Sequence, residues 1–225
     1  EGCNMIVKQK RITIASLAFL AIVVLHIIGL LFNARLAFVS KPLLITSLVI
    51  VYLVSVKKAN FWFVSALFFS FWGDVLLLFK EQFFVFGLAS FLLAHILYIK
   101  ITVAFFKKIS LQKIVLACLP FVIFLFSFLN LIKDNLGEFK IPVFVYGTVI
   151  SIFGIVSLLN YMQEKSTANS WLLLGTILFI TSDSLIAINK FYSPKEYYQI
   201  CIMLTYIVAQ YLICKAMIAK TYHQE

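Results

Sequence analysis

The sequence predicts an all-α polytopic membrane protein whose eight transmembrane helices form one bundle. Of its 225 residues, 63% are hydrophobic and only 12% are charged, whereas about a quarter of the residues in a soluble domain are charged. Apolar runs of about twenty residues, the length that crosses the hydrocarbon core of a bilayer, recur along the whole chain. The connectors between them are short, so we expect residues 1–225 to form a single integral-membrane domain.

The apolar runs give approximate bounds for the eight helices. These bounds are 12–32, 36–56, 61–79, 84–106, 111–132, 141–162, 170–188 and 197–218. Each run is long enough to cross about 30 Å of hydrocarbon at about 1.5 Å per residue. Helices are required because a lone strand would leave backbone groups without partners in lipid, and the alternating pattern of a membrane barrel is absent from the sequence.

The first run resembles a signal peptide because it follows three basic residues, Lys8, Lys10 and Arg11. It continues for about twenty residues without a small-residue cleavage site, so it is better interpreted as the first membrane helix.

A faint internal similarity relates the first four helices to the last four. Pro42 stands near the start of the second helix and Pro142 at the start of the sixth, while the third and seventh end in GDVLLLFK and SDSLIAINK. The corresponding polar positions of the fourth and eighth helices are His95, Tyr98, Tyr206 and Gln210. The pattern suggests two four-helix halves in parallel orientation, with chance similarity as the alternative.

The distribution of basic residues predicts the orientation in the membrane. An even number of helices puts both termini on one side, and the loops of that side carry more Lys and Arg than the opposite loops. The positive-inside rule therefore places both termini in the cytoplasm, and the composition suggests a bacterial cytoplasmic (inner) membrane. The net charge of +10 is spread through loops, which indicates contact with anionic membrane lipids and no nucleic-acid partner.

Asp74 and Asp183 are the acidic side chains that lie well inside apolar segments. A carboxylate at membrane depth costs at least about 2–3 kcal/mol, so it is normally kept where it faces a polar interior or has a function. Each stands five residues before the predicted outer end of its helix, about 7–8 Å below the outer boundary. Two acids at one depth, on helices that run in the same direction, can meet if those helices are neighbours.

Other polar residues predict a pocket that opens toward the outer leaflet. Lys190 shares a helical face with Asp183 and can reach back to it, although an ion pair that only makes the acid tolerable is an equal alternative. Lys41 either binds a lipid phosphate or extends to the headgroups. His95 is a lone histidine in an apolar helix, and such a residue is more often a hydrogen-bonding partner between helices than a catalytic group. Tyr146 can be an aromatic residue at the membrane interface. The candidate binding residues are Lys41, His95, Tyr98, Tyr146, Asn189, Lys190, Tyr206 and Gln210.

The sequence predicts no metal site and no cofactor. Its four cysteines show no CxxC pairing, and its three histidines form no cluster with the ligand number and spacing of a zinc or di-iron site.

Six segments carry a family resemblance. In chain order they are SKPLL at 40–44, GDVLLLF at 73–79, AHILY at 94–98, PVFVYGTVIS at 142–151, SDSLIAINKF at 182–191 and TYIVAQYLI at 205–213. Together they resemble the signatures of the YhhN-like lysoplasmalogenase family of integral-membrane alkenyl ether hydrolases, over nearly the whole chain. The two aspartate motifs with AHxxY between them are specific, and Ile186 stands where Leu is expected.

The resemblance implies an eight-helix hydrolase that acts on a lysophospholipid substrate. It would cleave the vinyl ether bond of lysoplasmenyl ethanolamine or choline lipids and release a fatty aldehyde and the glycerophospho-base, with Asp74 and Asp183 as catalytic carboxylates. Two carboxylates suit this reaction because one can donate a proton while the other stays charged, as in glycosidases. Of the two, Asp74 is the expected acid.

The alternative function is a proton-coupled transporter or channel that uses Asp74 and Asp183 as a proton relay. The helices lack the Gly and Pro interruptions of broken transport helices, which disfavours it. An opsin-like receptor is disfavoured because Lys190 lies too near its helix end. A small-residue face at Gly147, Ser151 and Gly154 serves packing within one copy or between copies, so the sequence leaves the oligomeric state open.

Overall fold

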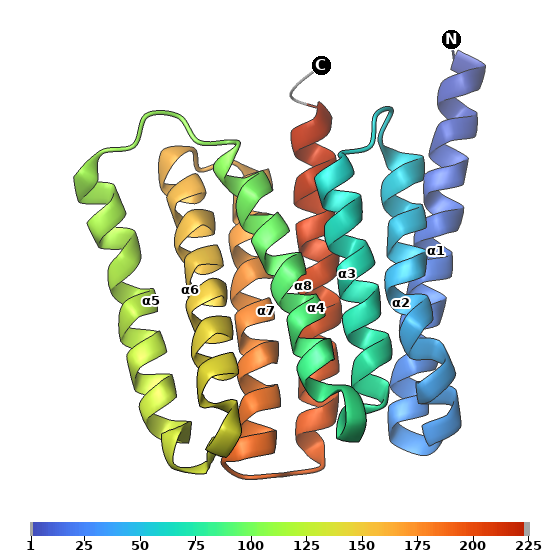
Figure 1. Cartoon of the computed structure of the whole chain (residues 1–225). Coiled ribbons are helices and arrows are strands. Elements are labelled where there is room, and N and C mark those ends of the chain that lie inside the picture. Colours follow the sequence, from blue (N-terminus) through green and yellow to red (C-terminus); the bar gives the residue numbers. More distant parts are fainter. Residues whose placement is uncertain (1, 223–225) are drawn as a thin grey trace. The chain divides into compact units, whose positions relative to one another are not determined.

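The computed structural model describes residues 2–222, with side chains described for residues 6–221. The described residues form eight long helices, each long and apolar enough to cross a membrane (Figure 1). Their bounds are Gly2–Phe32 (α1), Ala34–Ser55 (α2), Phe61–Leu78 (α3), Lys80–Val103 (α4), Leu111–Ile132 (α5), Lys140–Gln163 (α6), Thr167–Phe191 (α7) and Tyr197–Tyr222 (α8). Two 3-10 turns, Lys133–Asn135 (η1) and Gly137–Phe139 (η2), precede α6. The predicted all-α, multi-pass fold is confirmed.

Most helix bounds agree with the apolar runs, and the differences lie at the ends. The first helix begins at Gly2, ten residues before its predicted start, because Lys8, Gln9 and Lys10 are good helix formers even though they do not belong in hydrocarbon. The seventh helix is longer than predicted at both ends. Its start is fixed by Ser166, whose hydroxyl accepts a hydrogen bond from the backbone N–H of Asn169 at 3.2 Å.

Contacts among the described residues divide the chain into two compact units. Unit 1 comprises residues 1–94 and 217–225, and unit 2 comprises residues 95–216. The boundary falls inside α4, whereas the two four-helix halves suggested by the internal similarity would meet between α4 and α5.

Unit 1 is organised by a tight hairpin of α1 and α2. The side chain of Asn33 caps α2 by accepting hydrogen bonds from the N–H groups of Arg35 and Leu36 at 3.1 and 3.2 Å. A Cβ on Gly29 would lie 2.5 Å from the backbone nitrogen of Ala37, so the two backbones approach closely there. Consecutive helices joined by short connections run antiparallel, and the end of α1, the start of α2 and the end of α3 therefore lie at the same end of unit 1.

Unit 2 packs α6 against α7, with the start of α6 beside the end of α7. The hydroxyls of Ser157 and Thr176 lie 2.8 Å apart at the middle of this contact. At the far end, the buried amide of Asn160 donates to the carbonyl of Thr102 at 2.9 Å. These buried polar contacts fix α4, α6 and α7 relative to one another, and the three helices carry the polar cluster described below.

Candidate active site

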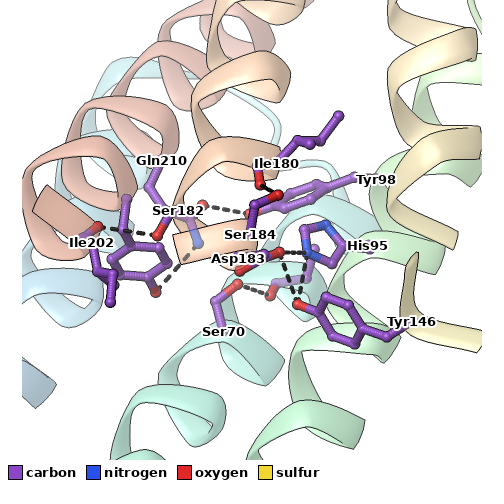
Figure 2. A network of polar contacts seen from close by, with 12 residues as sticks. Ser70, His95, Tyr98, Tyr146, Ile180, Ser182, Asp183, Ser184, Ile202 and Gln210 are labelled. Atoms are coloured by element: carbon purple, nitrogen blue, oxygen red, sulfur yellow. Dashed lines mark hydrogen bonds and ion pairs between the residues drawn. The ribbon is translucent and has the colours of Figure 1, made fainter. Parts of the chain in front are cut away.

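Asp183 lies at the centre of a buried polar cluster in unit 2. Its Oδ2 accepts a hydrogen bond from the phenol of Tyr146 at 2.9 Å and lies 3.0 Å from Nε2 of His95 (Figure 2). That nitrogen is also 3.2 Å from the Tyr146 oxygen. His95 is 0% exposed and the Asp183 side chain only 7%. Three helices, α4, α6 and α7, therefore converge on one carboxylate oxygen.

The hydrogen positions in this cluster follow from counting donors. Tyr146 has a single phenolic hydrogen, which is directed to Asp183, so both oxygens that face Nε2 of His95 are acceptors. Nε2 must then carry the hydrogen and donate it. Two donors on Oδ2 stabilise Asp183 as a carboxylate. No described residue donates to its other oxygen, Oδ1, which keeps its full capacity as an acceptor.

Aromatic rings hold the imidazole of His95 in place. The ring centroids of Phe179 and Phe153 lie 4.5 and 5.8 Å from that of His95, and the Tyr98 ring lies at 6.4 Å. The second nitrogen, Nδ1, is buried without a partner among the described residues. Such an apolar surrounding strengthens the hydrogen bond on the opposite side of the ring, because water does not compete for it.

A second polar chain in unit 2 joins α4 to α8. The hydroxyl of Tyr98 donates to Oε1 of Gln210 at 2.7 Å, and Nε2 of Gln210 points to the hydroxyl of Tyr206 at 3.4 Å (Figure 2). All three side chains are buried. The structure thus brings together three of the four polar residues that the sequence singles out on the fourth and eighth helices, and His95 belongs to the Asp183 cluster.

Asn189 and Lys190 have contacts other than those suggested by the sequence. Asp183 takes its polar contacts from Tyr146 and His95, whereas Nζ of Lys190 lies over the Phe139 ring at 5.4 Å. The amide oxygen of Asn189 accepts from the N–H of Lys195 at 2.8 Å and so closes the turn before α8. Spacing allowed Lys190 to reach the acid, but near a helix end its long side chain extends along aromatic surface instead.

Asp74 belongs to a polar group of unit 1. It is 2% exposed, near the end of α3, and the neighbouring Lys41 of α2 is 9% exposed. The two charges act on each other electrostatically. A Cβ on Gly73 would lie 2.6 Å from the ring of Phe91, so α3 lies close against α4 beside the acid.

His26 is a buried polar residue of this region that sequence reasoning missed. It is 1% exposed, and its Nδ1 lies 2.9 Å from the hydroxyl of Ser40. The sequence carries a signal for this contact, because His26 and Ser40 each stand seven residues from Asn33. Residues equally distant from the turn of a helical hairpin face each other across it.

No group of three His, Cys, Asp or Glu side chains that could hold a metal ion occurs within residues 6–221. The polar clusters described above are instead built from single carboxylates with hydrogen-bond donors and lysines around them.

Comparison with known proteins gives the family. Residues 36–217 match the model of the YhhN family. A Bos taurus protein named lysoplasmalogenase TMEM86A is 33% identical over 148 residues, which are 63% of this chain and 58% of that protein. Proteins named lysoplasmalogenase from Mycobacterium bovis and Mycobacterium tuberculosis are each 32% identical over 160 residues, 68% of this chain and 58% of theirs.

No solved structure matches this chain. The matched segments span less than two thirds of the curated relatives. The family model, in contrast, covers nearly all of α2, all of α3 to α7 and most of α8, including both aspartates. On this evidence, the chain belongs to the YhhN family.

Proposed function

We propose that this chain hydrolyses the vinyl ether bond of lysoplasmenyl phospholipids and releases a fatty aldehyde and glycerophosphoethanolamine or glycerophosphocholine. Family membership supports the reaction class, and the names of the bovine and mycobacterial relatives support the substrate. The observation that carries the proposal is the Asp183 carboxylate, whose side chain is 7% exposed and which receives two hydrogen bonds on one oxygen and none from a described residue on the other.

The chemistry begins with transfer of a proton to the outer carbon of the alkene. The carbon bonded to the ether oxygen then bears the positive charge of an oxocarbenium ion, to which water adds while losing a proton. The resulting hemiacetal collapses as its hydroxyl proton moves to the departing glycerol oxygen. The sum is substrate plus water giving aldehyde plus alcohol. One group must donate a proton, and another must stabilise the cation and accept a proton from water.

Asp183 suits the second role. Tyr146 and His95 stabilise its charged form through Oδ2, and Oδ1 remains able to accept a proton from water. Asp74 is the acid in this proposal, because the two donors on Asp183 favour its charged form and suit it to the other role. Reprotonation of Asp74 and loss of the proton from Asp183 complete the cycle.

The remaining residues bind and position. Lys41 and Lys190 contact the substrate phosphate, with Asn189 fixing the loop beside Lys190. His95 and Tyr146 are positioning residues that act through Asp183. The chain formed by Tyr98, Gln210 and Tyr206 orients water and the glycerol part of the substrate.

The two units form one integral-membrane domain in this proposal, in the cytoplasmic membrane with both termini in the cytoplasm. The lysine-rich loops support this orientation. Asp74 and Asp183 then each lie in the outward-facing half of a membrane-spanning helix.

The test is aldehyde release by purified protein from an alkenyl lysophosphoethanolamine, with an alcohol dehydrogenase and NADH to detect the product. The saturated alkyl ether of the same chain length is the control, because it has no alkene to protonate. We expect release only from the vinyl ether. A proton-coupled transporter would release no aldehyde from either lipid, and that result would contradict the proposal.

A further inference from the structure

His26 on α1 has one ring nitrogen that the structure leaves without a partner. Its Nδ1 lies 2.9 Å from the hydroxyl of Ser40, but its Nε2 is buried and has no hydrogen-bond partner among the described residues. A buried polar atom without a partner is destabilising and therefore rare in native structures, where a ligand or an ordered water usually supplies the missing contact. The question is which kind of group would fit.

The hydroxyl of Ser40 determines the tautomer of His26. It donates to the carbonyl of Leu36 at 2.7 Å, with the carbonyl of Ala37 at 3.3 Å. A hydroxyl has one hydrogen, so Ser40 can only accept from His26, and Nδ1 must carry the proton. In the neutral ring, Nε2 is then a hydrogen-bond acceptor. It requires a group that can donate a hydrogen bond, which a phosphate diester cannot do.

Lys41, the residue after Ser40, supplies a cation in the same region. Its side chain is nine-tenths buried, it makes no hydrogen bond to any described residue, and its charge acts on both His26 and Asp74. Asp74 acts on this ammonium group electrostatically, but a buried ammonium also needs hydrogen-bonding acceptors, which a bound anion would supply. This end of unit 1 therefore presents a neutral acceptor on α1 and, at the residue after its Ser40 partner, a cation whose charge acts on it.

We propose that His26 is a specificity residue for the glycerol backbone, whose free hydroxyl at C2 donates a hydrogen bond to Nε2 while Lys41 pairs with the phosphate on C3. The inference rests on the proposed function, because it names the substrate groups that this part of the site recognises. In a lysophospholipid the free hydroxyl and the phosphate stand on adjacent carbons. One bound molecule could therefore reach both His26 and Lys41. An acyl ester at C2 has no hydrogen to donate and is far larger than a hydroxyl, so the same contact disfavours two-chain lipids.

The test is a comparison of two ligands that the proposed reaction cannot cleave. Both are saturated 1-O-alkyl ether lysophosphoethanolamines of equal chain length, one with the C2 hydroxyl and one with hydrogen in its place. Their dissociation constants are measured by calorimetry with the full chain in nanodiscs. We expect the natural protein to prefer the hydroxyl ligand by about tenfold or more, since loss of the donor leaves Nε2 without its partner.

Variants assign the preference to His26. His26→Leu should bind the two ligands about equally, because its affinity for the hydroxyl ligand drops to that for the deoxy ligand. In His26→Gln a side-chain oxygen can replace Nε2, so part of the preference should return. Leu25→Ala, an exposed neighbour on α1, is the matched control and should keep the preference of the natural protein.

Equal affinity of the natural protein for the two ligands would overturn the inference, as would an unchanged preference in His26→Leu or binding of neither lipid. In those cases Nε2 holds only a structural water. Aldehyde release from the vinyl ether lipid is measured on the same preparations. Aldehyde release without a ligand preference would support the proposed hydrolysis and contradict the role of His26. A ligand preference without aldehyde release would support the role of His26 and contradict the proposed hydrolysis.

Discussion

At the scale of single residues, the proposed chemistry depends on how one carboxylate is held. Asp183 receives the hydrogen of Tyr146 and that of His95 on the same oxygen, and aromatic rings surround the imidazole. A carboxylate in this state can still respond to a developing positive charge or accept a proton from water.

Tyr146→Phe tests this arrangement because it removes one hydrogen and leaves the ring in place. Loss of a hydrogen bond to a charged group costs about 1.5–3 kcal/mol, which corresponds to a decrease of about ten- to a hundredfold in kcat. KM should change little, because Tyr146 acts through Asp183. The control is Tyr192→Phe, at an exposed tyrosine after α7. Steady-state aldehyde release measures both; equal rates for the two variants would contradict the role of Tyr146.

The sequence alone could identify most of these polar residues but not their partners. Asp183, His95 and Gln210 stand out because polar side chains are rare in apolar helices. Spacing along one helix shows which residues share a face, and on that basis Lys190 was the expected partner of Asp183. Which helices are neighbours is decided by packing over the whole fold, so Tyr146, also explained as an interface aromatic, could not be assigned to Asp183 in advance.

At the scale of elements, the hairpin of α1 and α2 positions the polar groups of unit 1. Gly29 allows the backbones to approach, and Asn33 caps the turn. This register brings Ser40 opposite His26 and places Lys41 next to it. The apolar runs predicted both helices but not this register, because hydropathy defines the length of a span and not the face on which two spans meet.

Gly29→Ala should lower the melting temperature of the protein in detergent. The added Cβ would lie 2.5 Å from the backbone nitrogen of Ala37, and a backbone atom cannot rotate away as a side chain can. Overpacking of this kind costs about 1–3 kcal/mol, more than the gain of about 0.5–1 kcal/mol from replacing a helical glycine.

Ala18→Leu is the matched control for that measurement, since it adds bulk to an exposed position of the same helix. Its melting temperature should stay close to that of the natural protein. A Gly29→Ala variant as stable as Ala18→Leu would show that α1 and α2 do not pack closely at this point.

At the scale of the whole molecule, the length and hydropathy of the apolar runs predict more of the structure than they do at the scale of residues or elements. Eight runs of sufficient length gave eight helices in the predicted order. The ends were less predictable: α1 begins ten residues before its apolar run, because a helix continues beyond the hydrocarbon for as long as its backbone hydrogen bonds remain favourable. The boundary between the two units, inside α4, has no counterpart in the hydropathy pattern.

The proposed orientation predicts the accessibility of two loops. In a cysteine-free background, Lys195→Cys between α7 and α8 should react with a membrane-impermeant maleimide added to intact cells. Lys57→Cys, between α2 and α3, should react only after the membrane is permeabilised. The two positions lie on opposite sides in any protein with these spans, so the reverse labelling pattern would place the termini and the proposed active site on the other faces.

If Asp74 and Asp183 hydrolyse the vinyl ether together, as we propose, the loss of either carboxyl group must stop turnover. Aldehyde release from alkenyl lysophosphoethanolamine is compared for the natural protein, Asp74→Asn and Asp183→Asn, each purified and shown to be folded. Asparagine keeps the shape of the side chain but neither donates an acid proton nor carries charge, so we expect both variants to fall by at least about a hundredfold. Near-normal turnover by either variant would contradict the paired mechanism.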